Sequence, residues 1–67
     1  MKTIAEQIEC AQRELRRRHN LYPEAIQLHT VTPEQAAHGI ECMEAIVETL
    51  KDYETKLAVE EEYRNQQ

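Results

Sequence analysis

The sequence predicts an all-α protein, a helical hairpin whose second helix is much longer than its first. Three observations predict it. Apolar residues recur every three or four positions in two segments, each segment begins at a threonine suited to a helix N-cap, and a Tyr-Pro pair lies between them. The second segment, Thr32 to about Glu62, contains only one proline and one glycine. We expect the 67 residues to form a single domain of two helices joined by a short helical turn. We expect this domain to dimerise into a helical bundle.

The first helix is expected to span residues 3–19. Thr3 suits the N-cap, because its hydroxyl can accept from the backbone N–H of Glu6, whose carboxylate can reach back to Thr3. Arginines precede His19, where positive charge favours a helix C-terminus, and Asn20 suits a left-handed stop. The apolar stripe of this helix consists of Ile4, Ile8, Ala11 and Leu15.

The connector is expected over residues 20–31, with a short helical turn that begins near Pro23. The long helix follows over residues 32–62, because Thr32 and Gln35 form a capping box around Pro33. Its polar end, residues 63–67, is expected to fray. Gly39 lies near the expected helix crossing, which favours a close backbone approach, with a mild hinge as the alternative. The apolar stripe of the long helix consists of Ala36, Ile40, Met43, Val47 and Leu50.

The two helices differ in length, and this predicts an uncovered surface. At 1.5 Å per residue the first reaches roughly 24 Å and the second roughly 45 Å, so an overhang of about 20 Å has no partner in the hairpin. A second apolar line follows the long helix into this overhang. We expect it to form a dimer interface, made of Ile46, Leu50, Tyr53 and Leu57.

The supply of core residues is small, which also favours self-association. Ile, Leu, Val and Phe account for 13 of the 67 residues. Chains of this size bury only about 60% of their unfolded surface and often rely on oligomerisation, metal or disulfides. Two isolated cysteines do not make a disulfide framework.

Charge is distributed unevenly along the chain. Residues 1–20 carry five basic and three acidic side chains, whereas residues 21–67 carry three basic and ten acidic ones. Either a basic helix lies against an acidic one, or the acidic surface meets a basic partner. An acidic ridge lies beside the apolar stripe of the long helix and is either a solvated face or a partner-binding surface. It consists of Glu41, Glu44, Glu48 and Asp52.

The residue content argues against an enzyme. The chain contains no serine, and one glycine cannot form a phosphate-binding loop. His38 and Cys42 are spaced i,i+4, and the hairpin would bring Cys10 to a similar height, but a structural zinc site normally uses four ligands. We therefore expect no catalytic residues, no metal and no cofactor.

A basic patch on the first helix suggests the alternative function, nucleic-acid binding or transcriptional regulation. Arg13, Arg16, Arg17 and Arg18 could contact phosphates. However, the whole chain is acidic, with a pI of about 5.1, whereas domains that bind nucleic acids are usually basic. Direct nucleic-acid binding is therefore the weaker hypothesis.

Neither a signal peptide nor an apolar stretch of membrane-spanning length is visible. The expected location is the cytoplasm, where both cysteines would stay reduced.

Several short motifs lie along the chain: Glu14-Leu15, Arg18, Tyr22-Pro23, Thr32, Ala36, Ile40, Met43-Glu44-Ala45-Ile46 and Thr49-Leu50. Together these motifs resemble a family of small uncharacterised proteins of bacteriophages and prophages. They lie within residues 3–50, and the segment 24–30 and the acidic extension after residue 50 depart from the family pattern. The resemblance implies a phage context, in which small acidic helical proteins often bind and block a host protein such as a defence complex; it assigns no functional residues.

Overall fold

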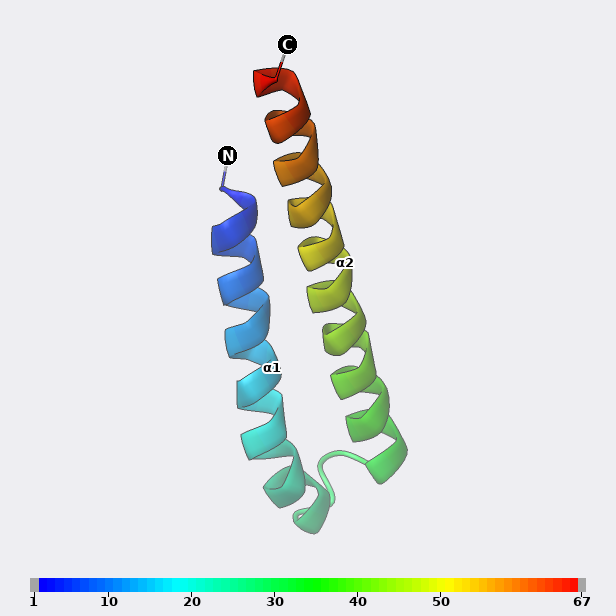
Figure 1. Ribbon diagram of the computed structural model, residues 1–67. Coiled ribbons are helices and arrows are strands. Elements are labelled where there is room, and N and C mark those ends of the chain that lie inside the picture. The colour runs from blue at the N-terminus through cyan, green and yellow to red at the C-terminus, as the bar shows by residue number, and fades with distance from the viewer. Residues whose placement is uncertain (1, 67) are drawn as a thin grey trace.

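The computed structural model describes residues 2–66, which form two antiparallel helices joined by a five-residue loop (Figure 1). Helix α1 spans Ile4–Gln27 and helix α2 spans Pro33–Asn65. Within residues 2–66 there is no strand. The hairpin measures 58 × 18 × 16 Å, and α2 extends beyond the first turn of α1 at the end where both termini lie. The all-α hairpin predicted from the sequence is confirmed.

Both predicted helix starts are present. The Thr3 hydroxyl accepts from the backbone N–H of Glu6 at 3.1 Å and donates to the Glu6 carboxylate at 3.0 Å. At Thr32 the capping box is complete, because the Gln35 N–H bonds to the Thr32 hydroxyl and the Gln35 side chain accepts from the Thr32 N–H. These caps satisfy N–H groups that have no partner inside their own helix.

The predicted end of the first helix, at residue 19, is wrong. Helix α1 runs through Asn20 and Pro23 to Gln27, so the predicted connector over residues 20–31 shrinks to residues 28–32. A proline inside a helix costs about 3 kcal/mol because it removes one backbone hydrogen bond and crowds the preceding turn. Tyr22 and Ile26, on either side of Pro23, are half-buried, and Tyr22 packs against Gly39 of α2. Consequently the arginines lie in the middle of α1, where they do not face the helix C-terminus.

His29 provides the left-handed stop that was predicted for Asn20. Its φ is 59°, and it is the only non-glycine residue with positive φ among residues 2–66. The Thr30 N–H bonds to the Ala25 carbonyl at 3.0 Å and the His29 N–H bonds to the Ile26 carbonyl at 3.1 Å. These two bonds form a Schellman motif, which satisfies the last carbonyls of α1 and turns the chain toward α2.

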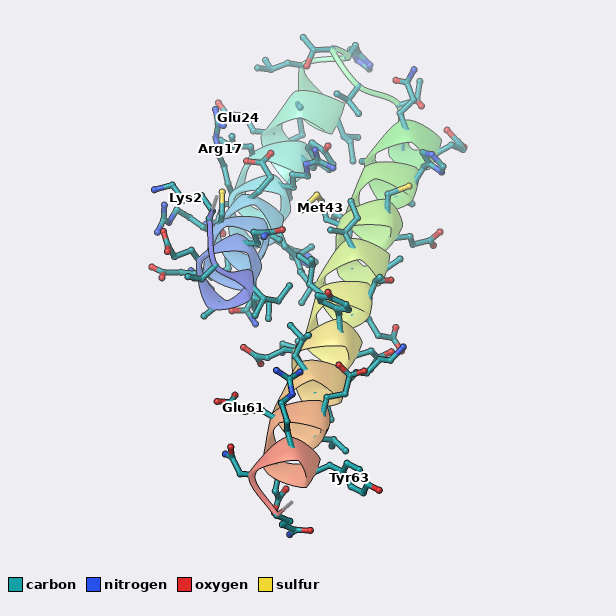
Figure 2. All side chains as sticks on the ribbon, turned by 90° about the horizontal axis from the view of Figure 1, so that it is seen from above. Lys2, Arg17, Glu24, Met43, Glu61 and Tyr63 are labelled. Carbon is teal, nitrogen blue, oxygen red and sulfur yellow. The ribbon has the colours of Figure 1, made fainter. Side chains whose placement is uncertain are left out.

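The core is one seam between the two helices. Buried side chains come from both predicted stripes, and the half-buried Leu15 and Leu50 pack against them. Figure 2 shows Met43 between the helices. No described side chain is fully enclosed, because a two-helix hairpin leaves every seam residue open on one side. The buried residues are Ile8, Ala11, Ala36, Met43 and Val47.

The far end of α2 differs from the prediction. The helix continues to Asn65 rather than ending at Glu62, so the predicted frayed tail over residues 63–67 is wrong for residues 63–65. Gln66 is the C-cap, and residue 67 lies outside the described residues. Because α2 has 33 residues and α1 has 24, the overhang is about 14 Å at 1.5 Å per residue, shorter than expected from the sequence.

Gly39 accommodates an aromatic ring rather than a neighbouring backbone. A Cβ added at Gly39 would lie 2.7 Å from the Tyr22 hydroxyl oxygen and 3.2 Å from ring carbon Cε2. The guanidinium of Arg18 also donates from Nη1 to the Gly39 carbonyl oxygen at 2.9 Å. The sequence thus placed the close approach at the right residue, but the group that approaches is a side chain of α1. This contact fixes the register of the two helices near the loop.

The left-handed backbone at residue 29 predicts opposite effects for two histidine substitutions. His29→Gly should stabilise the fold by about 0.5–1 kcal/mol, because glycine adopts positive φ without the Cβ clash. The control His19→Gly, in the middle of α1, should destabilise the fold by about 1 kcal/mol. Urea unfolding of both variants at one protein concentration measures the difference. Destabilisation by both substitutions would contradict the Schellman stop at His29.

The packing of Tyr22 on Gly39 predicts an energetic coupling. In a Tyr22→Ala background, Gly39→Ala should stabilise the fold by about 1 kcal/mol through helix propensity alone. With Tyr22 present, the new methyl group must displace the ring, so the gain should shrink or reverse. A double-mutant cycle by urea unfolding should give a coupling of at least about 0.5 kcal/mol. Additive effects would show that the packing of the Tyr22 ring does not require glycine at position 39.

Candidate interaction surfaces

An apolar strip runs along α2 on the side next to the helix seam. We use this name for Ile46, Leu50, Tyr53 and Leu57. The structure brings these four predicted residues onto one helix face, because their spacings of 4, 3 and 4 match the helical repeat. Ile46 is 46% exposed and Tyr53 52% exposed, while Leu50 is half-buried against α1. The strip therefore begins at the seam and continues as an uncovered surface beyond it.

An open groove of about 680 Å³ lies between the helices where the strip begins. Its apolar lining includes Ala11, Met43, Ile46 and Leu50, and charged side chains of α1 surround it. We call it the N-terminal groove. The sequence analysis missed this groove, because its existence depends on how far apart the helices lie. The one available signal was the small size of Cys10 and Ala11, which leave room beside the seam. The charged residues at its rim are Lys2, Glu6, Glu9, Arg13 and Glu14.

The acidic ridge lies on the other side of α2. Glu48 follows Ile46 by two residues, which at 3.6 residues per turn places it roughly 200° around the helix. All four ridge residues are exposed, and within residues 2–66 none of them takes part in an ion pair. Three of them, Glu44, Glu48 and Asp52, border a second, smaller groove of about 390 Å³, which Lys51 also lines. Leu15 and Val47 supply the apolar lining of this groove.

The arginines of α1 are mostly engaged within their own helix. Arg13 contacts the Glu9 carboxylate at 3.0 Å, and Arg17 contacts Glu14 at 3.7 Å. Arg18 also binds Glu14, at 3.1 Å, and donates to the carbonyl of α2 described above. Figure 2 shows Arg17 on the side of α1 away from α2.

Arg16 is exposed and, within the described part of the chain, takes part in no ion pair. Within residues 2–66 no ion pair joins α1 to α2. The basic charge of α1 is therefore reduced by its own acids, and the acidic charge of α2 is left facing solvent.

His38 and Cys42 lie together as their spacing predicted, with 3.4 Å between the histidine Nε2 and the cysteine Sγ. Both side chains are exposed, as is Cys10. Across residues 2–66 no group of three or more His, Cys, Asp or Glu side chains is arranged to hold a metal ion. Within residues 2–66 the pair therefore has no third ligand.

Neither α1 nor α2, as far as residues 2–66 extend, includes an 18-residue stretch apolar enough to cross a membrane. Comparisons of the sequence and structure with family models, curated proteins and solved structures found no match. The resemblance to a phage protein family stays a prediction. Fold and surfaces together define a two-helix hairpin with an apolar strip and an acidic ridge on different sides of its long helix.

Proposed function

We propose that this protein is a non-enzymatic protein-binding module that uses the acidic ridge and its adjoining groove to hold a partner protein. The observation that carries this proposal is the groove itself: apolar side chains of both helices lie beside three α2 carboxylates that have no ion-pair partner in residues 2–66, and Lys51 is the one basic residue of the lining. Apolar lining supplies binding energy, and surrounding charge selects the partner and steers it.

The partner that fits this surface is basic and amphipathic. An apolar ridge on the partner would cover Leu15 and Val47, while lysines or arginines beside it would meet Glu44, Glu48 and Asp52. A helix with apolar residues at i, i+3 and i+4 and flanking basic residues has this form. That the partner is a host protein, inhibited in the host cytoplasm by a phage-encoded protein, rests on the family resemblance alone.

We further propose that the module is a homodimer joined through the apolar strip. The hairpin leaves Tyr53 52% and Leu57 36% exposed, and within residues 2–66 its core contains no fully enclosed side chain. Burying the strip against a second copy would stabilise both chains at about 25 cal/mol per Å² of apolar surface removed from water. The acidic ridge, on the other side of α2, would stay accessible in such a dimer.

Nucleic-acid binding through the arginines has less support. Of the basic patch, only Arg16 lacks an ion pair among residues 2–66, and glutamates lie between the others. Phosphates would have to compete with these carboxylates and approach a chain of formal net charge −5.

Charge reversal on the ridge tests the binding function. Glu44→Lys/Glu48→Lys should abolish capture of the partner from a lysate of the host, because it replaces two attractive charges by repulsive ones. The control Glu24→Lys/Glu62→Lys changes the net charge equally at exposed sites away from the ridge and should leave capture intact. Mass spectrometry of the captured proteins identifies what is lost. Equal capture by both variants would refute the ridge as the binding surface.

The apolar strip predicts a site-specific effect on self-association. Leu57→Asp should convert the dimer to a monomer, because it buries a carboxylate in an apolar interface. Val59→Asp is the matched control, since Val59 is 58% exposed but lies off the strip, and it should leave the dimer unchanged. Sedimentation equilibrium at tens of micromolar measures both. A monomeric wild-type protein would refute the homodimer.

A further inference from the structure

The side chains of His38 and Cys42 lie on the outer side of α2, away from the helix seam. His38 follows the buried Ala36 by two residues, which at 3.6 residues per turn places it roughly 200° around the helix from that seam residue. Cys42 follows His38 by four residues and therefore lies one turn further along the same side. Both side chains are exposed. A solute can thus reach the histidine Nε2 and the cysteine Sγ together.

These two atoms are separated by the distance that a zinc ion requires of two of its ligands. Zinc binds sulfur at about 2.3 Å and imidazole nitrogen at about 2.0–2.1 Å, and a tetrahedral angle of about 109° then puts the two ligand atoms about 3.5 Å apart. In the hairpin, Nε2 of His38 and Sγ of Cys42 are 3.4 Å apart. A hydrogen bond between thiol and imidazole spans the same distance. A cation can therefore replace the thiol proton, which passes to solvent, with only a small rotation of the two side chains.

Carboxylates next to the pair favour a cation. Glu34 lies four residues before His38 and Glu41 three residues after it, so both share its side of the helix. Both are exposed, and within residues 2–66 neither takes part in an ion pair. Their negative charge raises the local concentration of cations around the histidine and the cysteine.

Basic side chains offer little opposition to a bound cation. Between residues 19 and 50 the sequence contains no lysine or arginine. Arg18 reaches this stretch of α2 from α1, where its guanidinium binds the carbonyl oxygen of Gly39. The same guanidinium is paired with the Glu14 carboxylate at 3.1 Å, which offsets its charge.

We propose that His38 and Cys42 form a binding site for a divalent cation of the zinc type, one per chain, with the other coordination positions open to water. Nitrogen and sulfur are ligands that zinc prefers. This site differs from the expectation of no metal, which rests on the four protein ligands of a structural zinc site. An open site needs fewer protein ligands, and within residues 2–66 the pair has no third one.

The charges around the pair favour one cation per chain over a cation shared by two chains. Two chains would supply two thiolates, which cancel the charge of a divalent cation, and would bring two copies of Glu34 and Glu41 together. Like charges held together in this way destabilise an interface. One chain supplies a single thiolate, so the bound cation keeps a positive charge beside its two carboxylates.

Thiol alkylation tests the site, because Cys10 is a control within the same molecule. Both thiols are exposed, but no histidine lies one turn before or after Cys10 in the sequence. Coordination removes the sulfur lone pair that attacks the reagent, so Zn²⁺ should slow the reaction of Cys42 with iodoacetamide by at least about tenfold and leave Cys10 unchanged. Mass spectrometry of peptides from the reduced protein measures both rates. Equal protection of the two thiols, or protection of neither, overturns the proposal.

Two histidine variants show whether the imidazole is a ligand. His38→Ala should remove the protection of Cys42, whereas His19→Ala, at an exposed histidine of α1, should retain it. Alanine favours a helix at both positions, so both variants should fold, and circular dichroism checks this. Protection of Cys42 that survives His38→Ala overturns the two-ligand site.

A titration with Co²⁺, which accepts the tetrahedral ligands of zinc, measures the number of cations bound. In a Cys10→Ser background, absorption from thiolate bound to cobalt should saturate at one Co²⁺ per chain, and Cys42→Ser should abolish it. Saturation at one Co²⁺ per two chains overturns the open site, and no such absorption overturns the site altogether. Both tests read Cys42 itself, so their outcome is separate from that of the proposed partner binding and homodimer.

Discussion

Two helices share only one line of contact, and the rest of this structure depends on that constraint. A residue on the seam can touch the opposite helix and its own neighbours, but its outer side stays open. The core side chains are accordingly buried but not fully enclosed. Ala36, the least exposed side chain within residues 2–66, is still 4% accessible. A chain that buries so little must gain stability elsewhere, because the entropy of ordering each residue costs about 1–2 kcal/mol. Local contacts supply part of this additional stability.

Those local contacts lie at the helix ends and near the loop. The threonine caps satisfy exposed N–H groups at both helix starts, and the Schellman turn at His29 satisfies the carbonyls at the end of α1. The contacts of Arg18 and Tyr22 with Gly39 hold the helices in register near the loop. At the opposite end no hydrogen bond or ion pair within residues 2–66 joins α1 to α2, and there the N-terminal groove opens. The proposed second copy would bind at the end that the hairpin itself leaves open.

The sequence predicted the features that depend on short-range patterns. Both N-caps and both apolar stripes could be read from spacing, because a helix fixes which residues are neighbours. The end of α1 could not be read in this way. Asn20 and Pro23 are local stop signals, yet α1 continues through both, and Tyr22 packs against Gly39 of α2. The overhang was overestimated for the same reason.

The candidate surfaces also differ in whether the sequence alone could predict them. The apolar strip and the acidic ridge are properties of one helix, so the sequence could place their residues on two sides of α2. The two grooves are properties of the space between helices, and only the structure reveals them. The ion pairing of the arginines within α1 likewise required side-chain positions, because the sequence equally allowed pairs between the helices.

The central claim is that the hairpin is incomplete alone and is stabilised by a second copy of itself. The concentration dependence of thermal unfolding, followed by circular dichroism at 222 nm, tests it most directly. For a chain that folds as a dimer, raising the concentration from about 1 to about 100 µM adds about 2.7 kcal/mol of stability and should raise the midpoint by about 5–10 °C. A midpoint that does not change with concentration would show that the hairpin folds by itself and would contradict the account.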